Sequence, residues 1–285
     1  MGDGARSVLI TGCSTGIGHA TALHLARKGF AVFATARRPE TLEDLARAGC
    51  QTLCLDVTHE ASMREAVNIV EADCGVVDVL INNAGYGLEG PIEELGLNEI
   101  RTQFETNLFG PTRLTQMVLP AMRQRRRGTI VNISSVGGRI TTPGTGAYHA
   151  SKHALEALSD VLRFELRGFG IDVIVVEPGA IRSRWVDTAV RGLEGRIDPD
   201  SPYAEFDRAV AKQMQGAHEG LLGLAAGSPE AVARVIEKAI TAPRPRRRYP
   251  VPASARLFIG MHHWLPSWVW DAFMRRMYPS PGVGH

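Results

Sequence analysis

Short apolar runs alternate along the chain with longer segments in which apolar residues recur every three or four positions. The short runs are apolar throughout, which is typical of parallel strands covered on both faces, and the longer segments have the period of amphipathic helices. The alternation predicts right-handed strand–helix–strand units and a doubly wound α/β domain with a parallel central sheet. We expect strands over residues 8–11, 31–36, 51–57, 77–85, 128–135 and 171–179, and helices over residues 17–28, 41–48, 59–73, 98–122 and 147–169.

The last third of the chain has a different character. Residues 186–227 are polar and weakly periodic, and we expect them to form a loop. The next segment opens as helices do, with an N-cap serine followed by proline and glutamate (Ser228–Glu230). Arginines, aromatic residues and prolines follow in the tail. We therefore expect one domain over residues 1–252, which includes the loop, and a helical C-terminal extension of apolar and basic character over residues 253–285.

The composition limits the possible partners. The chain has 285 residues, of which 44% are hydrophobic, and a net charge of +2. It can therefore bury a sizeable core, and it shows no excess of positive charge for a nucleic acid. We expect the arginine runs 123–128 and 244–248 to be solvated surface. The chain contains no run of 18 apolar residues, so we expect no membrane span.

Cysteine and histidine usage argues against a metal site. No two cysteines form a C-x-x-C pair, and His262 and His263 are adjacent rather than at the spacing of metal ligands on one helical face. We expect free thiols, buried or half-buried, in a reducing compartment, which indicates a cytoplasmic protein. The cysteines are Cys13, Cys50, Cys54 and Cys74.

A glycine-rich segment, TGCSTGIG (Thr11–Gly18), follows the first expected strand and precedes the first expected helix. Gly12, Gly16 and Gly18 allow a tight turn and a close backbone approach, and a helix N-terminus supplies free N–H groups and a positive dipole end. This context predicts a phosphate-binding turn, although the spacing is not G-x-G-x-x-G.

Tyr148 and Lys152 lie four residues apart in an alanine-rich helical segment, so they share one helical face. A free tyrosine has a pKa of about 10, which is too high for ready proton exchange at neutral pH. A neighbouring ammonium group favours the phenolate and lowers that pKa. The pair is therefore either an acid–base pair or a tyrosine packed on a lysine stem, and this segment alone does not decide between them.

Seven motifs occur in the order found in one known family: TGCSTGIG, LDV at 55–57, NNAG at 82–85, Asn107 in TNLFG, NISS at 132–135, YHASK at 148–152 and PGAIRS at 178–183. On these motifs, residues 7–185, and more loosely the chain up to residue 242, resemble a short-chain dehydrogenase/reductase of the compact single-domain type. The resemblance implies a Rossmann-type sheet with strand order 3-2-1-4-5-6, a seventh strand near Arg248–Val251, and a homodimer or homotetramer.

The resemblance also implies the roles of four catalytic residues. Tyr148 is the general acid–base, and Lys152 lowers its pKa and bonds the nicotinamide ribose. Ser135, thirteen residues before Tyr148, bonds the substrate oxygen, with the neighbouring Ser134 as the alternative. Asn107, a poor helix former, holds a water that relays protons from Lys152, or else marks a local kink.

The cofactor site follows from the same resemblance. Asp56 contacts the adenine, Asn83 contacts the adenosine side, and Ser183, where the family usually has threonine, bonds the carboxamide. Asp56 and Asn83 are otherwise plain strand-end caps. The implied cofactor-binding residues are Gly12, Ser14, Thr15, Gly16, Ile17, Gly18, Arg37, Arg38, Asp56, Val57, Asn83, Ala84, Gly85, Tyr148, Lys152, Pro178, Gly179, Ile181 and Ser183.

Arg37 and Arg38 follow the second expected strand, where an NAD-specific enzyme normally carries an acidic residue. A carboxylate repels a 2′-phosphate, whereas arginine binds it through charge-assisted hydrogen bonds. We therefore expect NADP(H) in preference to NAD(H). The alternative is that both arginines are merely solvated.

Within the family, the stretches ITGCSTGIG, VFATARRPE and INNAGYGLEGP resemble the hydroxysteroid and retinol dehydrogenase groups, which act on lipophilic alcohols and ketones. The expected reaction is hydride transfer between the nicotinamide and a lipophilic secondary alcohol/ketone or alcohol/aldehyde pair. Two alternatives stay open. An NAD(P)-dependent epimerase or dehydratase usually has a larger C-terminal domain, and a non-catalytic cofactor-sensing protein typically lacks the tyrosine or the lysine.

The tail, residues 255–279, combines tryptophans with arginines, a mixture that suits a boundary between apolar and polar surroundings. Three placements are open. The tail packs on its own domain or a partner subunit, covers an apolar substrate pocket, or rests on a membrane surface, since it is too short to span one.

Overall fold

The computed structural model describes residues 5–216 and 226–282. Within them, the strands form one parallel sheet in the order β3-β2-β1-β4-β5-β6-β7. This order confirms the predicted doubly wound topology and the seventh strand. The strands are β1 (Ser7–Ile10), β2 (Ala31–Ala36), β3 (Gln51–Cys54), β4 (Val79–Asn82), β5 (Gly128–Ile133), β6 (Ile171–Pro178) and β7 (Arg248–Val251).

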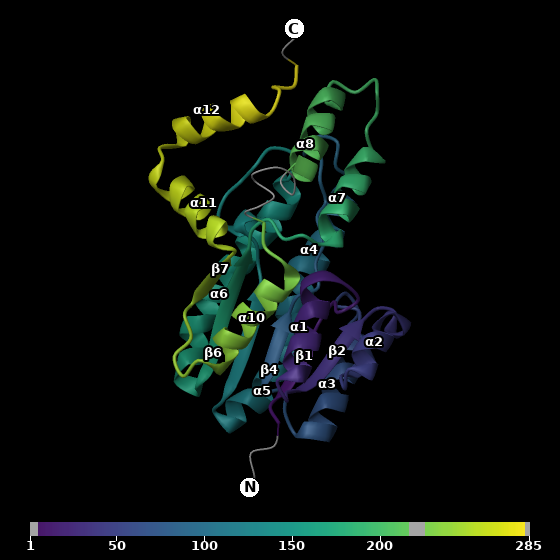
Figure 1. Cartoon of the computed structure of the whole chain (residues 1–285), viewed down its shortest axis with the longest axis vertical. Coiled ribbons are helices and arrows are strands. Elements are labelled where there is room, and N and C mark those ends of the chain that lie inside the picture. The colour runs from purple at the N-terminus through teal and green to yellow at the C-terminus, as the bar shows by residue number, and fades with distance from the viewer. Residues whose placement is uncertain (1–4, 217–225, 283–285) are drawn as a thin grey trace.

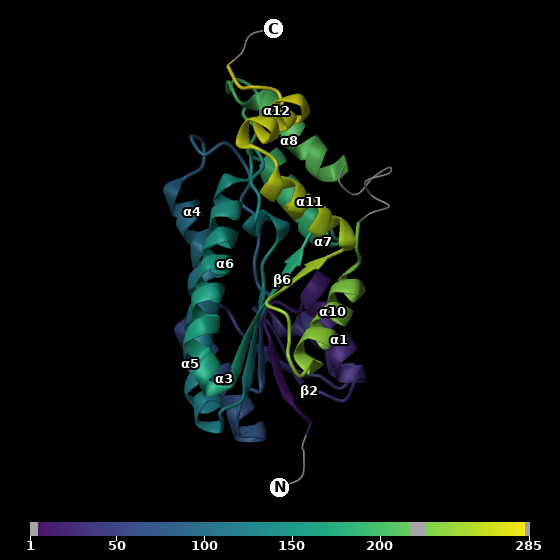
Figure 2. The same ribbon diagram turned by 90° about the vertical axis from the view of Figure 1, so that its left-hand side faces the viewer.

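Helices cover both faces of the sheet, as Figure 2 shows. One face is covered by α1 (Gly16–Arg27), α10 (Pro229–Thr241) and the short α2 (Glu43–Arg47). The other is covered by α3 (Glu60–Cys74), α5 (Gly110–Arg125) and α6 (Gly146–Leu166), with α4 (Leu97–Phe104) beyond them. The predicted start of α10 is confirmed, because the Ser228 hydroxyl accepts a hydrogen bond from the Ala231 amide at 3.3 Å.

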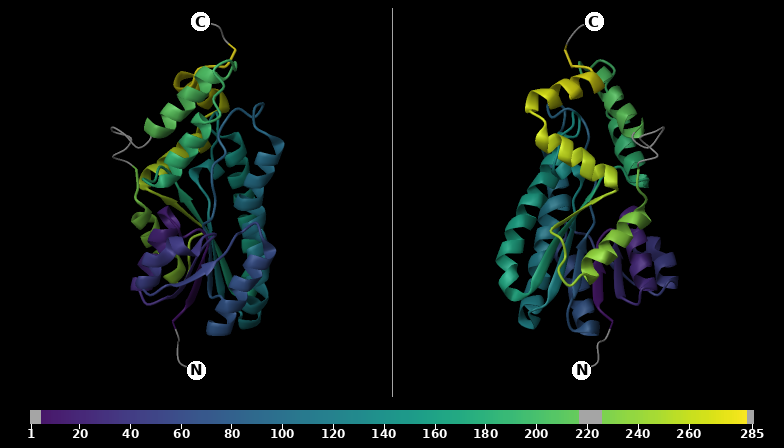
Figure 3. Two further views of the ribbon diagram at one scale, coloured as in Figure 1. Left: turned by 90° about the vertical axis from the view of Figure 1, so that its right-hand side faces the viewer. Right: turned by 60° about the vertical axis from the view of Figure 1, so that its left-hand side comes forward.

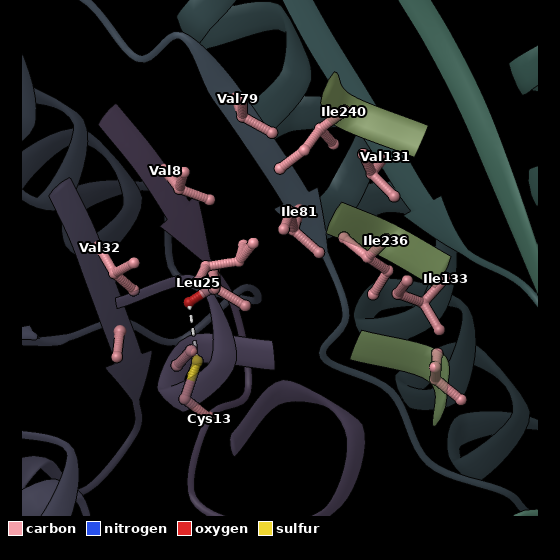
Figure 4. Packing of buried hydrophobic residues seen from close by; sticks show 14 of the residues in the cluster. Val8, Cys13, Leu25, Val32, Val79, Ile81, Val131, Ile133, Ile236 and Ile240 are labelled. Atoms are coloured by element: carbon pink, nitrogen blue, oxygen red, sulfur yellow. Dashed lines mark hydrogen bonds between the residues drawn. The ribbon is translucent and has the colours of Figure 1, made fainter. Parts of the chain in front are cut away.

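Alternating strand residues build a core on each side of the sheet. On β1, Val8 and Ile10 pack into the cluster with α1 and α10, whereas Leu9 packs into the cluster with α3 and α5. Figure 4 shows the first cluster, in which Leu25 and Ile236 come from the helices. Burying one such side chain contributes about 1.5–3 kcal/mol. The two clusters therefore hold the carboxyl end of β1, where the glycine turn begins.

Three strands end two or three residues earlier than the apolar runs predict. Asp56, Asn83 and Ser135 consequently lie in loops at the carboxyl edge of the sheet rather than in β3, β4 and β5. Short polar side chains at strand ends bond nearby backbone in place of the next ladder bond. Asp56 does so, because its Oδ1 accepts from the Thr58 amide at 2.9 Å.

The single helix predicted over residues 98–122 consists of three segments. A π-helical turn, Glu105–Phe109, separates α4 from α5. Pro111 has no N–H to donate to the carbonyl of Asn107, four residues earlier, so the regular helical ladder cannot continue there. The segment predicted as a helix over residues 41–48 is likewise divided, into a 3₁₀ turn (Pro39–Leu42) and α2.

The predicted loop over residues 186–227 is wrong for most of its length. It contains the end of α7 (Arg184–Glu194) and all of α8 (Ala204–Gly216), which bury Val190, Leu193, Phe206 and Val210 together. The polar connection between the two helices breaks the apolar period, and this break masked both of them. Residues 217–225 of the predicted loop lie outside the described residues.

The four cysteines are free, as predicted. Cys13 and Cys50 are buried and Cys74 is half-buried, but Cys54 is exposed, which the prediction missed. Cys54 ends β3, the edge strand of the sheet, where no neighbouring strand covers it. Figure 4 shows how the Cys13 thiol is held, through a hydrogen bond to the Ile10 carbonyl at 3.3 Å.

The tail forms two helices, α11 (Ala253–Trp264) and α12 (Ser267–Met277). With α7 and α8 they lie beyond the carboxyl ends of the strands, at the end of the molecule opposite the N-terminus (Figures 1 and 3). Trp270 and Met274 are buried against Ile140, and the Trp270 indole donates to the Thr141 carbonyl at 3.3 Å. The tail therefore packs on its own domain.

No helix in the described part of the chain is long and apolar enough to cross a membrane.

Arg248, on the edge strand β7, joins three elements through carboxylates. Its Nε lies 3.0 Å from Glu156 on α6 and 3.3 Å from Glu177 on β6, and its second nitrogen donates to Asp160 at 2.6 Å. Burial, and then the charge of Glu156, raise the pKa of Glu177 to about 7, although Arg139 and Arg248 oppose this. The cluster fixes β6 and β7 against α6, the helix that carries the tyrosine–lysine pair.

We expect Arg248→Lys to lower the free energy of unfolding by about 1–2 kcal/mol at pH 8, because one ammonium cannot serve three carboxylates. Urea denaturation measures this loss. The raised pKa of Glu177 means that the fold favours its protonated form. As pH falls from 8 to 5 the carboxyl takes up its proton, so the difference from the native protein should shrink. A difference that stays constant down to pH 5 would assign the loss to packing instead.

Candidate active site

The turn after β1 depends on glycine. Gly12 and Gly16 have positive φ angles of 73° and 62°, which glycine adopts without steric cost. Gly18 faces the same turn from α1, and a Cβ there would lie 2.4 Å from the Gly12 carbonyl oxygen. The three glycines therefore let the helix N-terminus approach the end of the strand, as a phosphate-binding turn requires.

The N-terminus of α1 is suited to an anion. Thr15 is the N-cap residue, yet no side chain in the described part of the protein caps the helix, so the first-turn N–H groups keep their capacity to donate. Ser14 and Thr15 are exposed beside them. Ser183, at the start of α7, has its Cβ 3.7 Å from the position of a Cβ on Gly16. Free N–H groups at the positive end of a helix fit the pyrophosphate of a dinucleotide.

Asn83 joins two strand-end loops. Its Nδ2 donates to the carbonyls of Thr11, at 2.9 Å, and Gly12, at 3.0 Å. The Thr11 hydroxyl accepts from the amides of Asn83 and Ala84, both at 3.0 Å. The bracing of the sheet implied for Asn83 is therefore present, while its contact with a cofactor stays a prediction.

Ser135 and Tyr148 meet beyond the end of β5. The Ser135 hydroxyl hydrogen-bonds the Tyr148 phenol, and its oxygen also accepts from the Gly137 amide at 3.0 Å. Ser134 is buried and points elsewhere, because its Oγ lies 2.7 Å from the position of a Cβ on Gly138. In this structure the hydroxyl beside the phenol is thus that of Ser135, the residue preferred from the sequence.

Lys152 lies one helical turn from Tyr148 on α6. Its Nζ is 5.9 Å from the tyrosine ring centroid and donates to the Ile133 carbonyl at 2.8 Å. Burial lowers the pKa of Lys152 to about 8, although Glu156 opposes this. A Cβ on Gly85 would lie 3.6 Å from Nζ, so glycine at that position leaves room beside the ammonium.

Asn107 lies in the π-helical turn, next to the same glycine. Its Nδ2 donates to the Tyr86 carbonyl at 2.9 Å and to the Ser151 hydroxyl at 3.1 Å, and its Oδ1 accepts from the Tyr86 amide at 3.1 Å. The side chain is therefore committed to the protein and positions the segment beside Lys152. The local irregularity is present, and the water-holding role remains a prediction.

The protonation of Tyr148 differs from the expectation. Burial raises the pKa of the phenol, the hydrogen bond from Ser135 offsets this only in part, and the charge of Glu89 adds to the rise. The predicted lowering of this pKa therefore does not hold for the protein by itself, because burial is the largest influence on the phenol. The protein keeps the phenol protonated, which is the form that donates a proton to a carbonyl oxygen.

Arg37 and Arg38 follow β2 with exposed side chains. Arg37 acts electrostatically on Asp56, whose carboxylate accepts from the Thr58 hydroxyl at 2.7 Å as well as from its amide. Burial alone would raise the pKa of Asp56, but the Thr58 bonds, with the charges of His59 and Arg37, hold it below its ordinary value. Asp56 is thus an ionised cap of its loop, and its contact with adenine stays a prediction.

Other implied cofactor residues lie along the same edge with different surroundings. A Cβ on Gly179 would lie 3.1 Å from the Cβ of Ala255 in α11, so the tail closes over this glycine. Ile181 forms a β-bridge with Gly227. Val57 is buried in the core with α3 and α5, so its side chain does not face a ligand and only its backbone remains for one.

Two residues of the site, Trp185 and Glu89, were not identified from the sequence. Trp185, just before the region predicted as a loop, has its ring centroid 5.1 Å from that of Tyr148. A Cβ on Gly87 would lie 2.9 Å from the Trp185 ring and 2.4 Å from Oε1 of Glu89. The available signal was a charged residue, Glu89, inside the otherwise uncharged run NNAGYGLEGP.

Comparison with known proteins identifies the family. The family model for short chain dehydrogenases matches residues 6–193. The uncharacterized oxidoreductase YbbO of Escherichia coli (strain K12) is 38% identical over 271 residues, which cover 95% of this chain and 94% of YbbO. Retinol dehydrogenase 8 of Bos taurus is 39% identical over 267 residues, which cover 87% of this chain and 82% of the bovine protein.

Solved structures agree. A short-chain dehydrogenase from Streptomyces avermitilis superposes with a TM-score of 0.80 at 34% identity, covering 96% of this chain and 97% of its own. A variant of actinorhodin polyketide ketoreductase, solved with NADPH, superposes with a TM-score of 0.72 at 32% identity, covering 88% and 97%. The chain is an oxidoreductase with an NAD(P)-binding Rossmann-type fold, and it belongs to the short-chain dehydrogenase family.

Proposed function

We propose that this enzyme transfers hydride between NADP(H) and a lipophilic substrate, either a secondary alcohol/ketone or an alcohol/aldehyde pair. The observation that carries the proposal is the convergence of Ser135, Tyr148 and Lys152 at the carboxyl edge of the sheet. Helices α7, α8 and α12 lie beyond that edge.

Each of the three side chains has a defined task. When bound, the nicotinamide supplies or accepts the hydride. In the reducing direction, the protonated phenol of Tyr148 donates to the substrate oxygen, and the Ser135 hydroxyl bonds the same oxygen as charge develops on it. Lys152, with its pKa lowered to about 8, returns a proton toward Tyr148 and bonds the nicotinamide ribose.

The cofactor preference rests on the end of β2. The strand end reads Thr35-Ala36-Arg37-Arg38 and contains no acidic residue, and both arginines are exposed. Their guanidinium groups suit the 2′-phosphate of NADP(H), and the polyketide ketoreductase neighbour was solved with NADPH. The full set of cofactor-binding residues predicted from the sequence belongs to this proposal.

The substrate side favours an apolar molecule. Trp185 lies beside Tyr148, and Val210 of α8 approaches Gly144, just before the catalytic helix, with 2.6 Å between its Cγ2 and the position of a Cβ on that glycine. Tyr278, directly after α12, packs with both neighbouring apolar clusters. A relative is named for retinol. Residues 1–252 would then form the catalytic domain, and residues 253–285 an extension that helps to cover the site.

We propose in addition that the enzyme is a homodimer or homotetramer in the cytoplasm. The outward face of α6 carries unusually exposed apolar side chains, with Phe164 at 82% and Val161 at 55% exposure. Phe109 and Phe169 are exposed as well. A second copy of the chain would cover them, since apolar patches of this kind mark protein interfaces.

The proposed function is tested by NADPH oxidation against a panel of carbonyl compounds. Bulky apolar ketones and aldehydes should be reduced, and short polar ones should react poorly. An epimerase or dehydratase would convert its substrate without net oxidation of NADPH, and a cofactor-sensing protein would bind NADPH without turnover. Either result would overturn the proposal.

Removal of α12 by ending the chain at Leu265 should raise KM several-fold for bulky apolar ketones and little for small ones. The reason is that the truncation removes Trp270 and Met274, which pack on Ile140 beyond the carboxyl edge, and with them the proposed cover of the substrate. Trp268→Ala, which removes a side chain 69% exposed on the same helix, is the control and should leave both values near native. A folded, truncated enzyme with an unchanged substrate profile would exclude the covering role.

A further inference from the structure

Glu89 is a buried acid that the mechanism above does not use. Its side chain is 1% exposed, and within the described residues neither carboxyl oxygen has a hydrogen-bond partner. Burial raises the pKa of Glu89 to about 8. A buried polar group without a partner costs free energy, so a partner that arrives only during function is the natural explanation.

The carboxyl group lies near Trp185, which packs beside Tyr148. Its Oε1 and the Trp185 ring both approach Gly87, where a Cβ would come within 2.4 Å and 2.9 Å of them. The Trp185 ring in turn lies 5.1 Å from the Tyr148 ring. An ionised Glu89 would also raise the pKa of Tyr148 and of Tyr278.

The adjacent residue shows that this orientation is specific. Leu88 packs the opposite way, into a cluster with Leu95 and Ala147. A leucine and a glutamate at consecutive positions thus have two different surroundings, the first an apolar contact with α6 and the second the neighbourhood of Gly87 and Trp185. A solvated glutamate would have remained at the surface.

A bound ammonium group would favour the ionised form of Glu89, which burial alone disfavours, so the carboxyl would release its proton when the amine binds. A primary ammonium has three donors, so it can serve both unpaired carboxyl oxygens, whereas a hydroxyl donates once and leaves one oxygen unpaired. Aromatic faces add cation–π attraction, and the Trp185 ring lies near the carboxyl. The combination favours a cationic amine over a neutral polar group.

We propose that Glu89 binds the ammonium group of a lipophilic amino ketone or amino alcohol and thereby selects such substrates, an inference that rests on the proposed function. The carbonyl or carbinol oxygen meets Tyr148 and Ser135, the ammonium meets Glu89, and the apolar chain lies along α7 and α8. Glu89 takes no part in the hydride or proton transfer.

The test compares a long-chain α-amino ketone with the same ketone lacking the amine, using NADPH oxidation by the full-length enzyme. We expect native kcat/KM to favour the amino ketone by about tenfold or more, the change that one charge-assisted hydrogen bond produces. Glu89→Gln, which keeps the shape but not the charge, should bring the ratio to about one, and Glu89→Leu should favour the plain ketone. A ratio that persists in Glu89→Gln, or is absent from the native enzyme, overturns the inference.

Asp207→Asn is a matched control. Asp207 is a second buried acid, 3% exposed with an unpaired oxygen, on α8, and its substitution should leave the amine preference in place. If Asp207→Asn abolishes the preference as Glu89→Gln does, general charge rather than Glu89 selects the amine, and the inference fails.

A binding measurement separates this inference from the proposed function. Isothermal titration with a long-chain alkylamine and the matching alkanol should show an amine preference in the native enzyme that Glu89→Gln loses. Such binding without turnover of any ketone would contradict the proposed function and support the amine site. Ketone turnover with no Glu89-dependent amine binding would leave the function standing and overturn the site.

Discussion

Tyr148→Phe is expected to lower kcat by about 10²- to 10⁴-fold while the dissociation constant of NADPH changes by less than about twofold. The substitution removes the phenol oxygen, which exchanges the proton with the substrate, and leaves the ring that packs beside Trp185. Ser135 can still polarise the substrate oxygen, so a residual rate should remain. Steady-state kinetics and a fluorescence titration of NADPH measure the two quantities.

Tyr203→Phe is the matched control for the loss of a phenol hydroxyl. Its hydroxyl donates to the Glu93 carboxylate at 2.6 Å and not to a catalytic residue, so its loss should leave kcat near native. Lys152→Ala should differ from both variants, lowering kcat and weakening NADPH together, because the ammonium lies beside both the phenol and the glycine edge at Gly85. Near-native turnover by Tyr148→Phe would rule out the mechanism.

The sheet was predictable because its strands are buried on both faces. Runs such as Val8–Ile10 and Val79–Ile81 are apolar throughout, and this pattern has few explanations other than a parallel sheet between two helical layers. The strand order was not available from periodicity. It came from the resemblance, because apolar runs of similar composition do not show which strands are neighbours in the sheet.

Of the helices beyond the carboxyl edge, α7 and α8 were not predicted, for a physical reason. α7 and α8 bury only short apolar stripes against one another, around Val190 and Val210, and the rest of their surface is polar. A stripe of that length is lost when a window also includes the polar connection between the helices. At Asn107 a local kink was one of two open interpretations, because the apolar period continues through this position, although Pro111 carried the signal.

The site was likewise predictable where family motifs identify its residues, and unpredictable where distant parts of the chain determine its properties. The family motifs identified Ser135, Tyr148 and Lys152. Ser135 lies just after β5, and the other two lie one turn apart on α6. The direction of the pKa shift of Tyr148 and the burial of Glu89 depend on residues distant in sequence, such as Trp185 of α7, that pack beside them. These are long-range properties, so no local pattern reports them.

The second large effect concerns the cofactor. NADPH should be preferred over NADH by at least about tenfold in kcat/KM, and Arg37→Ala with Arg38→Ala should bring the ratio close to one. Each charge-assisted contact with the 2′-phosphate is worth about 1.5–3 kcal/mol, and NADH has no 2′-phosphate with which to make such a contact. The double variant should therefore act almost entirely on NADPH, through KM rather than kcat.

Removing two positive charges also changes the field around the whole enzyme, so contact and field have to be separated. Arg275→Ala with Arg276→Ala removes the same charge from exposed positions on α12, far along the chain from β2, and should leave the NADPH:NADH ratio at its native value. Moderate salt weakens long-range attraction between exposed charges. The ratio of the native enzyme should therefore fall only partly in salt, while that of the Arg37/Arg38 variant stays near one. If the double variant at β2 keeps the native ratio, the 2′-phosphate binds elsewhere and both arginines are merely solvated.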